Sequence, residues 1–183
     1  MTALALLRMI PSPPGRITAG KVLLNDENLL TATKNRINSI RGKEISMIFQ
    51  EPMSSLNPVY TVGNQIVETI RRHKPVSRPE ALEAAIELLR MVQIPAPDRR
   101  INEYPHQLSG GMRQRVMIAM ALACSPKVLV ADEPTTALDV TVQAQIFDLL
   151  KEIQETNGTS IILTKNMSLR DNYTSTYISL IIF

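Results

Sequence analysis

The stretch from residue 127 to 164 constrains the fold most, because it predicts two buried strands joined by one long helix. Residues 127–131 (Lys-Val-Leu-Val-Ala) form a short apolar run bounded by a proline and two acids, which is typical of a central parallel strand. Residues 140–156 have a helical apolar period that ends at Asn157-Gly158, and residues 159–164 predict the next strand. The inward-facing positions of the helix are Val142, Ile146, Leu149, Leu150 and Ile153. Strand–helix–strand order at this spacing predicts an α/β fold with a mostly parallel sheet.

The preceding residues add a helical insertion to this core. Residues 2–10 predict a short helix, residues 16–24 a strand broken by a turn near Gly20, and residues 44–50 a buried strand. Residues 61–123 are mainly helical, and Ser77 to Glu80 has the form of a capping box. We therefore expect a helical block inserted between two strands of one sheet.

Composition limits the class of protein. The 183 residues fit one domain, and 44% hydrophobic with 20% charged residues is typical of a globular protein. The net charge of +3 is far below that of strongly nucleic-acid-binding domains, and we expect no nucleic-acid partner. The single cysteine, Cys124, cannot form an internal disulfide, and no Cys/His group has metal-ligand spacing. No apolar stretch reaches the ~18–20 residues that span a bilayer.

Two carboxylates, Asp132 and Glu133, directly follow the 127–131 strand. Open α/β sheets bind ligands at the C-terminal ends of their strands. Asp132 is suited to hold Mg²⁺, and Glu133 to take a proton from an attacking water as general base. Mg²⁺ prefers carboxylates together with phosphate oxygens, so the pair indicates a nucleotide. A strand end without any ligand is the alternative.

A second candidate site is the sequence Leu-Ser-Gly-Gly-Met-Arg-Gln-Arg at 108–115, which runs into a helix. Gly110 and Gly111 let the backbone approach a phosphate closely, and a helix N-terminus offers free N–H groups. Ser109 adds a hydroxyl donor. The alternative is a serine that caps the helix without a ligand.

Taken together and in this order, these motifs resemble the ABC ATPase family. The resemblance rests on the Leu-Ser-Gly-Gly-x-x-Gln-Arg segment, the strand that ends in Asp-Glu-Pro, and Thr-Ala-Leu-Asp at 136–139. Gln50, at the end of its strand, matches the glutamine of the family's Q-loop. Residues 49–58, 104–106 and 134–145 look like the dipeptide/oligopeptide importer branch. The resemblance covers roughly residues 1–164.

The resemblance implies a P-loop NTPase core with a mostly parallel sheet, a small antiparallel β part and an inserted helical subdomain. We expect residues 1–60 to belong to the core through the Q-loop and residues 61–123 to form the helical subdomain. Residues 124–164 return to the catalytic core, and residues 165–183 are a divergent tail. The implied function is the ATP-binding subunit of an importer for peptides or related small solutes, at the cytoplasmic face of the membrane.

In the family, two such domains pair head to tail and enclose two ATP molecules, and they drive membrane permease subunits. By resemblance Asp132 serves Mg²⁺, Glu133 polarises the water, and Gln50 contacts Mg²⁺ and senses the membrane partner. The residues implied to bind the partner's nucleotide are Ser109, Gly110, Gly111 and Gln114. Asp139 is expected at the seam between the two domains, where it also suits a helix N-cap.

The sequence departs from the family at both ends. The phosphate loop G-x-x-x-x-G-K-[ST] would be expected just before Thr2. Residues 15–22 imitate its spacing, but Val22 has no hydroxyl for Mg²⁺ and no helix is predicted after it. At the other end, Lys165-Asn166 stands where the family has His-Asp. We expect an incomplete core that does not hydrolyse ATP at a useful rate on its own, because the loop that cradles the phosphates is absent.

Two other functions stay open at this point. One is a non-catalytic partner, which either lends Ser109, Gly110 and Gly111 to an intact ATPase subunit or uses the helical block to contact a membrane subunit. The other is a DNA-repair or chromosome-organising relative. The helical block of near 60 residues has no cysteine pair, which disfavours the DNA-directed relatives with their long coiled coils or zinc modules.

Overall fold

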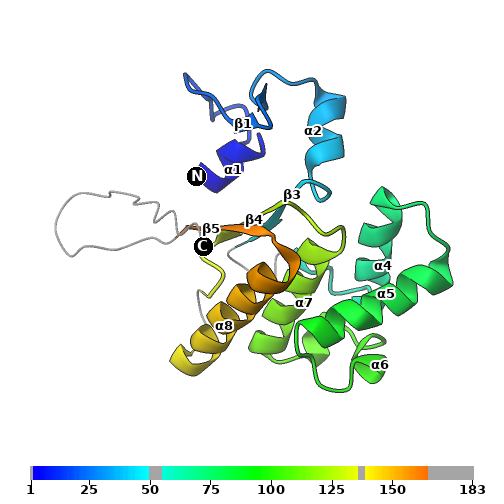
Figure 1. Ribbon diagram of the computed structural model, residues 1–183. Coiled ribbons are helices and arrows are strands. Elements are labelled where there is room, and N and C mark those ends of the chain that lie inside the picture. Colours follow the sequence, from blue (N-terminus) through cyan, green and yellow to red (C-terminus); the bar gives the residue numbers. More distant parts are fainter. Residues whose placement is uncertain (1, 50–54, 136–138, 165–183) are drawn as a thin grey trace.

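A computed structural model describes residues 2–49, 55–135 and 139–164 of the chain. Its centre is a parallel sheet in the order β3 (Ile45–Ile48), β4 (Val128–Asp132) and β5 (Ser160–Thr164) (Figure 1). In this register β4 pairs with β3 from Val128 to Ala131 and with β5 from Val128 to Asp132. The predicted central strand is therefore confirmed, and its C-terminal end lies beside that of β5.

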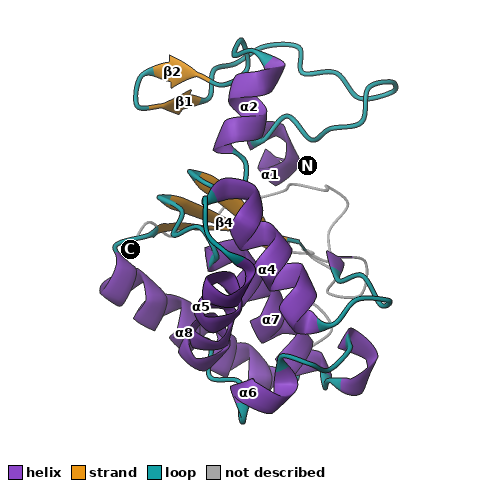
Figure 2. Ribbon diagram, turned by 90° about the vertical axis from the view of Figure 1, so that its right-hand side faces the viewer, coloured by secondary structure: helices purple, strands orange, loops and turns teal. Residues whose placement is uncertain are grey.

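Apolar layers cover both faces of the sheet. On one face lie α1 (Thr2–Leu6), α2 (Lys34–Ile40) and an antiparallel ribbon of β1 (Leu23–Leu24) with β2 (Glu27–Asn28) (Figures 1 and 2). On the other face lie α7 (Gly110–Leu122) and α8 (Val140–Asn157). Val130 of β4 belongs to the core of the first face, whereas Leu129 and Ala131 belong to the core of the second. This division follows from the period-2 alternation of side chains along a strand.

The helical insertion lies to one side of the sheet and contains α4 (Val62–His73), α5 (Arg78–Met91) and α6 (Pro97–Arg100). A short 3-10 turn (Pro105–Gln107) then leads to α7. The predicted capping box is confirmed, since Ser77 Oγ accepts from the Glu80 N–H and the Glu80 carboxylate accepts from the Ser77 N–H. Gly63 lets α4 approach the segment after α6, where its N–H donates to the Ile101 carbonyl at 2.7 Å.

The structure corrects the sequence-based prediction in residues 16–40. The predicted strand over 16–24 is reduced to Leu23–Leu24, because residues 16–20 are almost all exposed and the described chain gives them no strand to pair with. The helix α2 was not predicted. Thr33 caps it by accepting from the Arg36 N–H, and its buried Ile37 and Ile40 pack under the sheet. The sequence did not indicate this helix because two apolar residues, three positions apart, are too few to establish a helical period.

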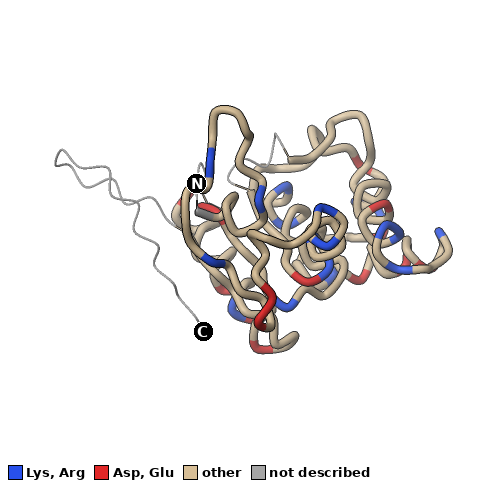
Figure 3. Tube along the Cα trace, turned by 90° about the horizontal axis from the view of Figure 1, so that it is seen from above, with Lys and Arg blue, Asp and Glu red and all other residues tan. Residues whose placement is uncertain are grey.

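Neither the charged residues nor the apolar helices mark out a particular surface of the described chain. Basic and acidic residues are interspersed along the helices (Figure 3). No helix in the described part of the chain is long and apolar enough to cross a bilayer. The domain boundaries drawn from the sequence stay predictions, and the proposed tail 165–183 lies outside the described residues.

Candidate functional site

The two carboxylates stand together at the C-terminal edge of the sheet. Asp132 is the last residue of β4 and pairs in register with Thr164, the last residue of β5. The Thr164 hydroxyl donates to the Asp132 carboxylate. The Glu133 N–H donates to the Thr164 carbonyl at 3.0 Å. Both carboxylates are half-buried, so each is held by the fold and still accessible at the edge.

Glu133 has an unusual backbone conformation. Its φ of 47° lies in the left-handed region, which a non-glycine residue seldom occupies. Such a conformation persists only where the surroundings enforce it, and it occurs often at functional sites. Here the bond from the Glu133 N–H to Thr164 supplies part of that constraint. Six other non-glycine residues in the described part of the chain share this region, so the conformation accounts for the turn after β4 and does not by itself indicate a function.

The glycine-rich segment begins α7. Ser109 is the exposed N-cap of this helix, and its Oγ accepts from the Met112 N–H at 3.3 Å. The capping alternative for Ser109 is thus observed. The first turn of α7 also presents N–H groups that lie before the helical hydrogen-bond ladder, which favour an anion.

Gly111, in the first turn of α7, packs against the start of α8. A Cβ built on Gly111 would lie 3.1 Å from Val142 Cγ1, a tight contact that would require Val142 to shift by a few tenths of an ångström. Asp139 caps α8, with its Oδ1 accepting from the Val142 N–H at 2.9 Å. The exposed residues Ser109 and Asp139 therefore cap two helices that touch at their N-terminal ends. The expected N-cap role of Asp139 is confirmed.

The predicted site also includes two glutamines, Gln114 and Gln50. Gln114 has only 1% of its surface exposed, and its Nε2 has no hydrogen-bond partner among the residues that the structure describes. Because the side chain lies in the interior, this conformation does not present it to a nucleotide. Gln50 lies outside the described residues, so its roles stay predictions.

The donor set fits Mg²⁺ only in combination with a nucleotide. No group of three or more His, Cys, Asp or Glu suited to a metal occurs in residues 2–49, 55–135 and 139–164. Mg²⁺ is usually bound by one or two carboxylates together with substrate phosphates. Asp132 and Glu133 supply two adjacent carboxylates, with one Asp132 oxygen accepting from Thr164. These residues match the protein half of such a site.

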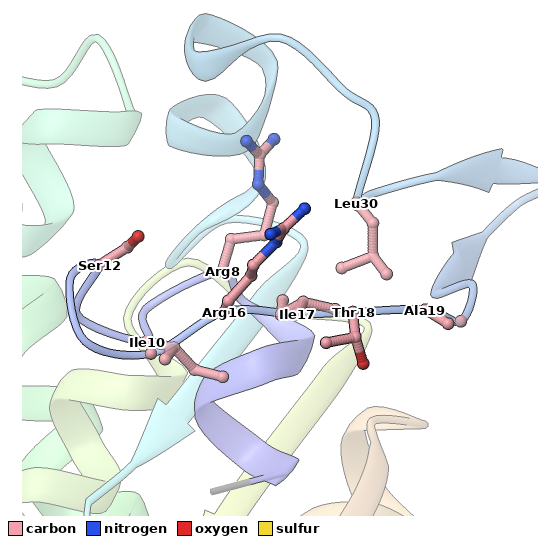
Figure 4. Close-up of a pocket in the computed structure, with 10 residues that line it drawn as sticks. Arg8, Ile10, Ser12, Arg16, Ile17, Thr18, Ala19 and Leu30 are labelled. Carbon is pink, nitrogen blue, oxygen red and sulfur yellow. The ribbon is translucent and has the colours of Figure 1, made fainter.

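A cavity of about 480 Å³ lies elsewhere, around the segment that imitates a phosphate loop (Figure 4). Arg8 and Arg16 point the same way at its edge, and Arg8 Nη1 donates to the Ala32 carbonyl at 2.6 Å. No predicted site residue lines it. Strand β1 follows Val22 directly, without the helix that a phosphate loop requires. The rejection of this segment as a phosphate loop is confirmed.

Comparison with known proteins decides the family. The model of the ABC transporter family matches residues 2–136. The chain belongs to the ABC transporter family. Both the Asp-Glu strand end and the glycine-rich start of α7 lie within the matched residues.

Within the ABC transporter family, the chain is similar to proteins named for peptide transport. A "Probable peptide ABC transporter ATP-binding protein" of Sinorhizobium fredii is 54% identical over 162 residues, covering 88% of this chain and 48% of that protein. The oligopeptide transport ATP-binding protein OppD of Bacillus subtilis is 52% identical, covering 88% and 45%. The chain thus spans about half the length of these curated relatives.

A solved ATP-binding cassette has the same fold. That structure is dimeric and represents a post-hydrolysis state bound to ADP and Pi. It is similar with a TM-score of 0.70 and 32% identity, over 80% of this chain and 62% of that one. The predicted α/β architecture of an ABC ATPase core is therefore confirmed.

Two contributors to this ABC site were missed from the sequence. Thr164 was assigned only to a strand, although the paired strands bring it beside Asp132. Val142 was assigned only to a helix interior, although it also sets the spacing to Gly111. The signal for Thr164 was a hydroxyl at the end of the neighbouring parallel strand. The signal for Val142 required the helix packing itself.

Proposed function

We propose that this chain acts as the ATP-binding part of an ABC importer for peptides or related small solutes. The observation that carries the proposal is the pair of half-buried acidic residues at the C-terminal end of β4, both hydrogen-bonded to Thr164 of β5, within a chain about half identical to peptide transport ATP-binding proteins. The proposed location is peripheral, at the cytoplasmic face of the membrane.

The carboxylate edge does the chemistry in this proposal. Asp132 would hold the metal, while Thr164 holds the Asp132 carboxylate in place. Glu133 accepts the proton of the attacking water as general base. Mg²⁺, when bound with ATP, neutralises the charge that develops on the phosphates. Gln50 is proposed as a further contact to the metal and to the membrane partner.

The start of α7 acts toward a second subunit. Ser109, Gly110 and Gly111 are proposed to contact the nucleotide held by a partner ATPase, and Asp139 to lie at the seam between the two. The exposure of Ser109 and Asp139 supports this orientation. The solved cassette is dimeric, which supports pairing of two such domains. Gln114 supports α7 from the interior, since its side chain is buried. Membrane permease subunits are the proposed further partners.

A mixed dimer tests the site that acts in trans. The chain is added to an OppD variant in which the serine aligned with Ser109 is replaced by arginine, and this variant must first be shown to lack ATP turnover by itself. We expect the added chain to restore Mg²⁺-dependent ATP turnover, because Ser109 completes the site of the partner. Ser109→Arg in this chain removes the rescue.

Ser77→Arg is the matched control. Ser77 is an exposed serine N-cap of α5, as Ser109 is of α7, so both variants lose a cap. The rescue should survive Ser77→Arg. A cross-linked mixed dimer without turnover would contradict the nucleotide role of Ser109. If no mixed dimer forms, the proposal that this chain pairs with a second ATPase subunit is wrong.

A further inference from the structure

We propose that Thr164 is a positioning residue for both acidic residues of the site, orienting the carboxylate of Asp132 and holding the backbone of Glu133. This inference rests on the proposed function of Asp132 and Glu133. Thr164 contacts Asp132 through its side chain and Glu133 through its backbone. One residue of β5 thereby sets the direction of two adjacent residues, the last of β4 and the one that follows it.

The side chain of Thr164 is buried beside Asp132. Thr164 is 8% exposed, and its hydroxyl reaches both the Asp132 Oδ1 and the Ala131 carbonyl, the latter at 3.5 Å. A hydroxyl has one proton to donate. A bond to an ionised carboxylate is shorter and stronger than a bond to a neutral carbonyl, so the proton is directed to Asp132. One Asp132 oxygen is then occupied, and the other is presented to a metal.

The backbone of Thr164 holds the next residue. Its carbonyl accepts the Glu133 N–H at 3.0 Å, directly after the last ladder pair between Asp132 and Thr164. Glu133 leaves the strand there with a φ of 47°. The turn away from β4 thus begins at a point that Thr164 fixes.

Threonine suits both roles. Its branched Cβ restricts χ1, so the hydroxyl has few alternative directions. Valine has the same shape without the hydroxyl, and Thr164→Val leaves the backbone bond to Glu133 intact. The substitution therefore separates the orientation of Asp132 from the rest of the site.

The chain contains a matched control directly before the first residue of β5. Thr159 is 3% exposed, and its hydroxyl donates to the Pro126 carbonyl, before β4, at 3.0 Å. Thr159→Val also removes one buried threonine hydroxyl bonded to a backbone carbonyl, but at the opposite end of the sheet from the carboxylates. It reproduces the structural cost of Thr164→Val without touching the site.

The test is Mn²⁺ binding to the full chain at a fixed concentration of ATP, which supplies the phosphate ligands, observed by NMR of ¹³C-labelled alanine methyl groups. Mn²⁺ is a paramagnetic substitute for Mg²⁺ that broadens nearby signals even at low occupancy. We expect Ala131, next to Asp132, to broaden in the wild type and not in Asp132→Asn. Thr164→Val should require about tenfold more Mn²⁺, as for other residues that orient metal ligands. Thr164→Ser keeps the hydroxyl and Thr159→Val keeps the site, so both should stay within about twofold of the wild type, well below the tenfold change.

The outcomes separate the two hypotheses. Loss of broadening in Asp132→Asn with an unchanged titration in Thr164→Val overturns the positioning role and leaves the proposed function standing. Broadening that persists in Asp132→Asn overturns the metal site and the inference with it. An equal shift in Thr159→Val assigns the effect to stability and also overturns the inference.

One measurement does not depend on a folded variant. The Thr164 hydroxyl proton should exchange slowly with solvent in the wild type and show a nuclear Overhauser contact to the Asp132 Hβ protons. A hydroxyl proton that exchanges too fast to observe, or that contacts only Ala131, overturns the inference even if Thr164→Val fails to fold.

Discussion

Replacement of Gly111 by alanine should destabilise the protein, although alanine is the better helix former. Within a helix, alanine is favoured over glycine by about 1 kcal/mol. The new Cβ, however, would lie 3.1 Å from Val142 Cγ1 and 3.9 Å from Cγ2, where carbon atoms prefer about 3.5–4.0 Å. Val142 cannot turn away easily, because valine in a helix strongly prefers one rotamer.

The balance of the two terms gives the expected size. Overpacking costs about 1–3 kcal/mol, so the net loss in Gly111→Ala is about 1 kcal/mol. Val142→Ala makes room for the new methyl group, and the double variant should recover about 2 kcal/mol relative to additivity. Urea unfolding of the four proteins, followed by circular dichroism, measures this coupling. A Gly111→Ala protein at least as stable as the wild type would refute the packing argument, and so would strict additivity.

Three further predictions test the fold. Gly63→Ala should cost about 3 kcal/mol or more, at the upper end for overpacking, because its Cβ would meet both the carbonyl oxygen and Cγ1 of Ile101 at 2.7 Å; urea unfolding measures the loss. Burial, with Arg72 and Lys43 nearby, lowers the pKa of His73, so stability should fall as pH drops below the unfolded value of about 6.5, and His73→Gln should flatten that slope in thermal denaturation. Hydrogen bonds from Ser77 lower the pKa of Glu80, so the wild type should gain stability over Ser77→Ala as pH rises through the acidic range, and a difference independent of pH would contradict this.

The strands and long helices were predictable because their signals are local. The apolar run before Asp132 has the composition of a central parallel strand, and β4 lies between β3 and β5 as expected. The capping box of Ser77 and the left-handed Gly158 that ends α8 are short-range patterns, and the structure contains both. By contrast, α2 and the true extent of β1 depend on what packs against them.

The candidate site divides in the same way. The sequence alone determined which chemical groups are present: Asp132 and Glu133 at a strand end, and Ser109 with two glycines at a helix start. These assignments need only the order of residues and the C-terminal edge rule for open sheets. The sequence also suggested Gln114 as a nucleotide contact, whereas the helix buries that side chain.

The tertiary structure alone decided which distant residues hold those groups. Thr164 lies 32 residues beyond Asp132 in the chain and becomes its hydrogen-bond donor because the register of β4 and β5 places the two strand ends side by side. Val142 constrains Gly111 because α7 and α8 approach at their first turns. Such contacts come from the alignment of whole elements, which no local pattern specifies. The sequence therefore determined the chemistry of the site, and the packing decided its geometry.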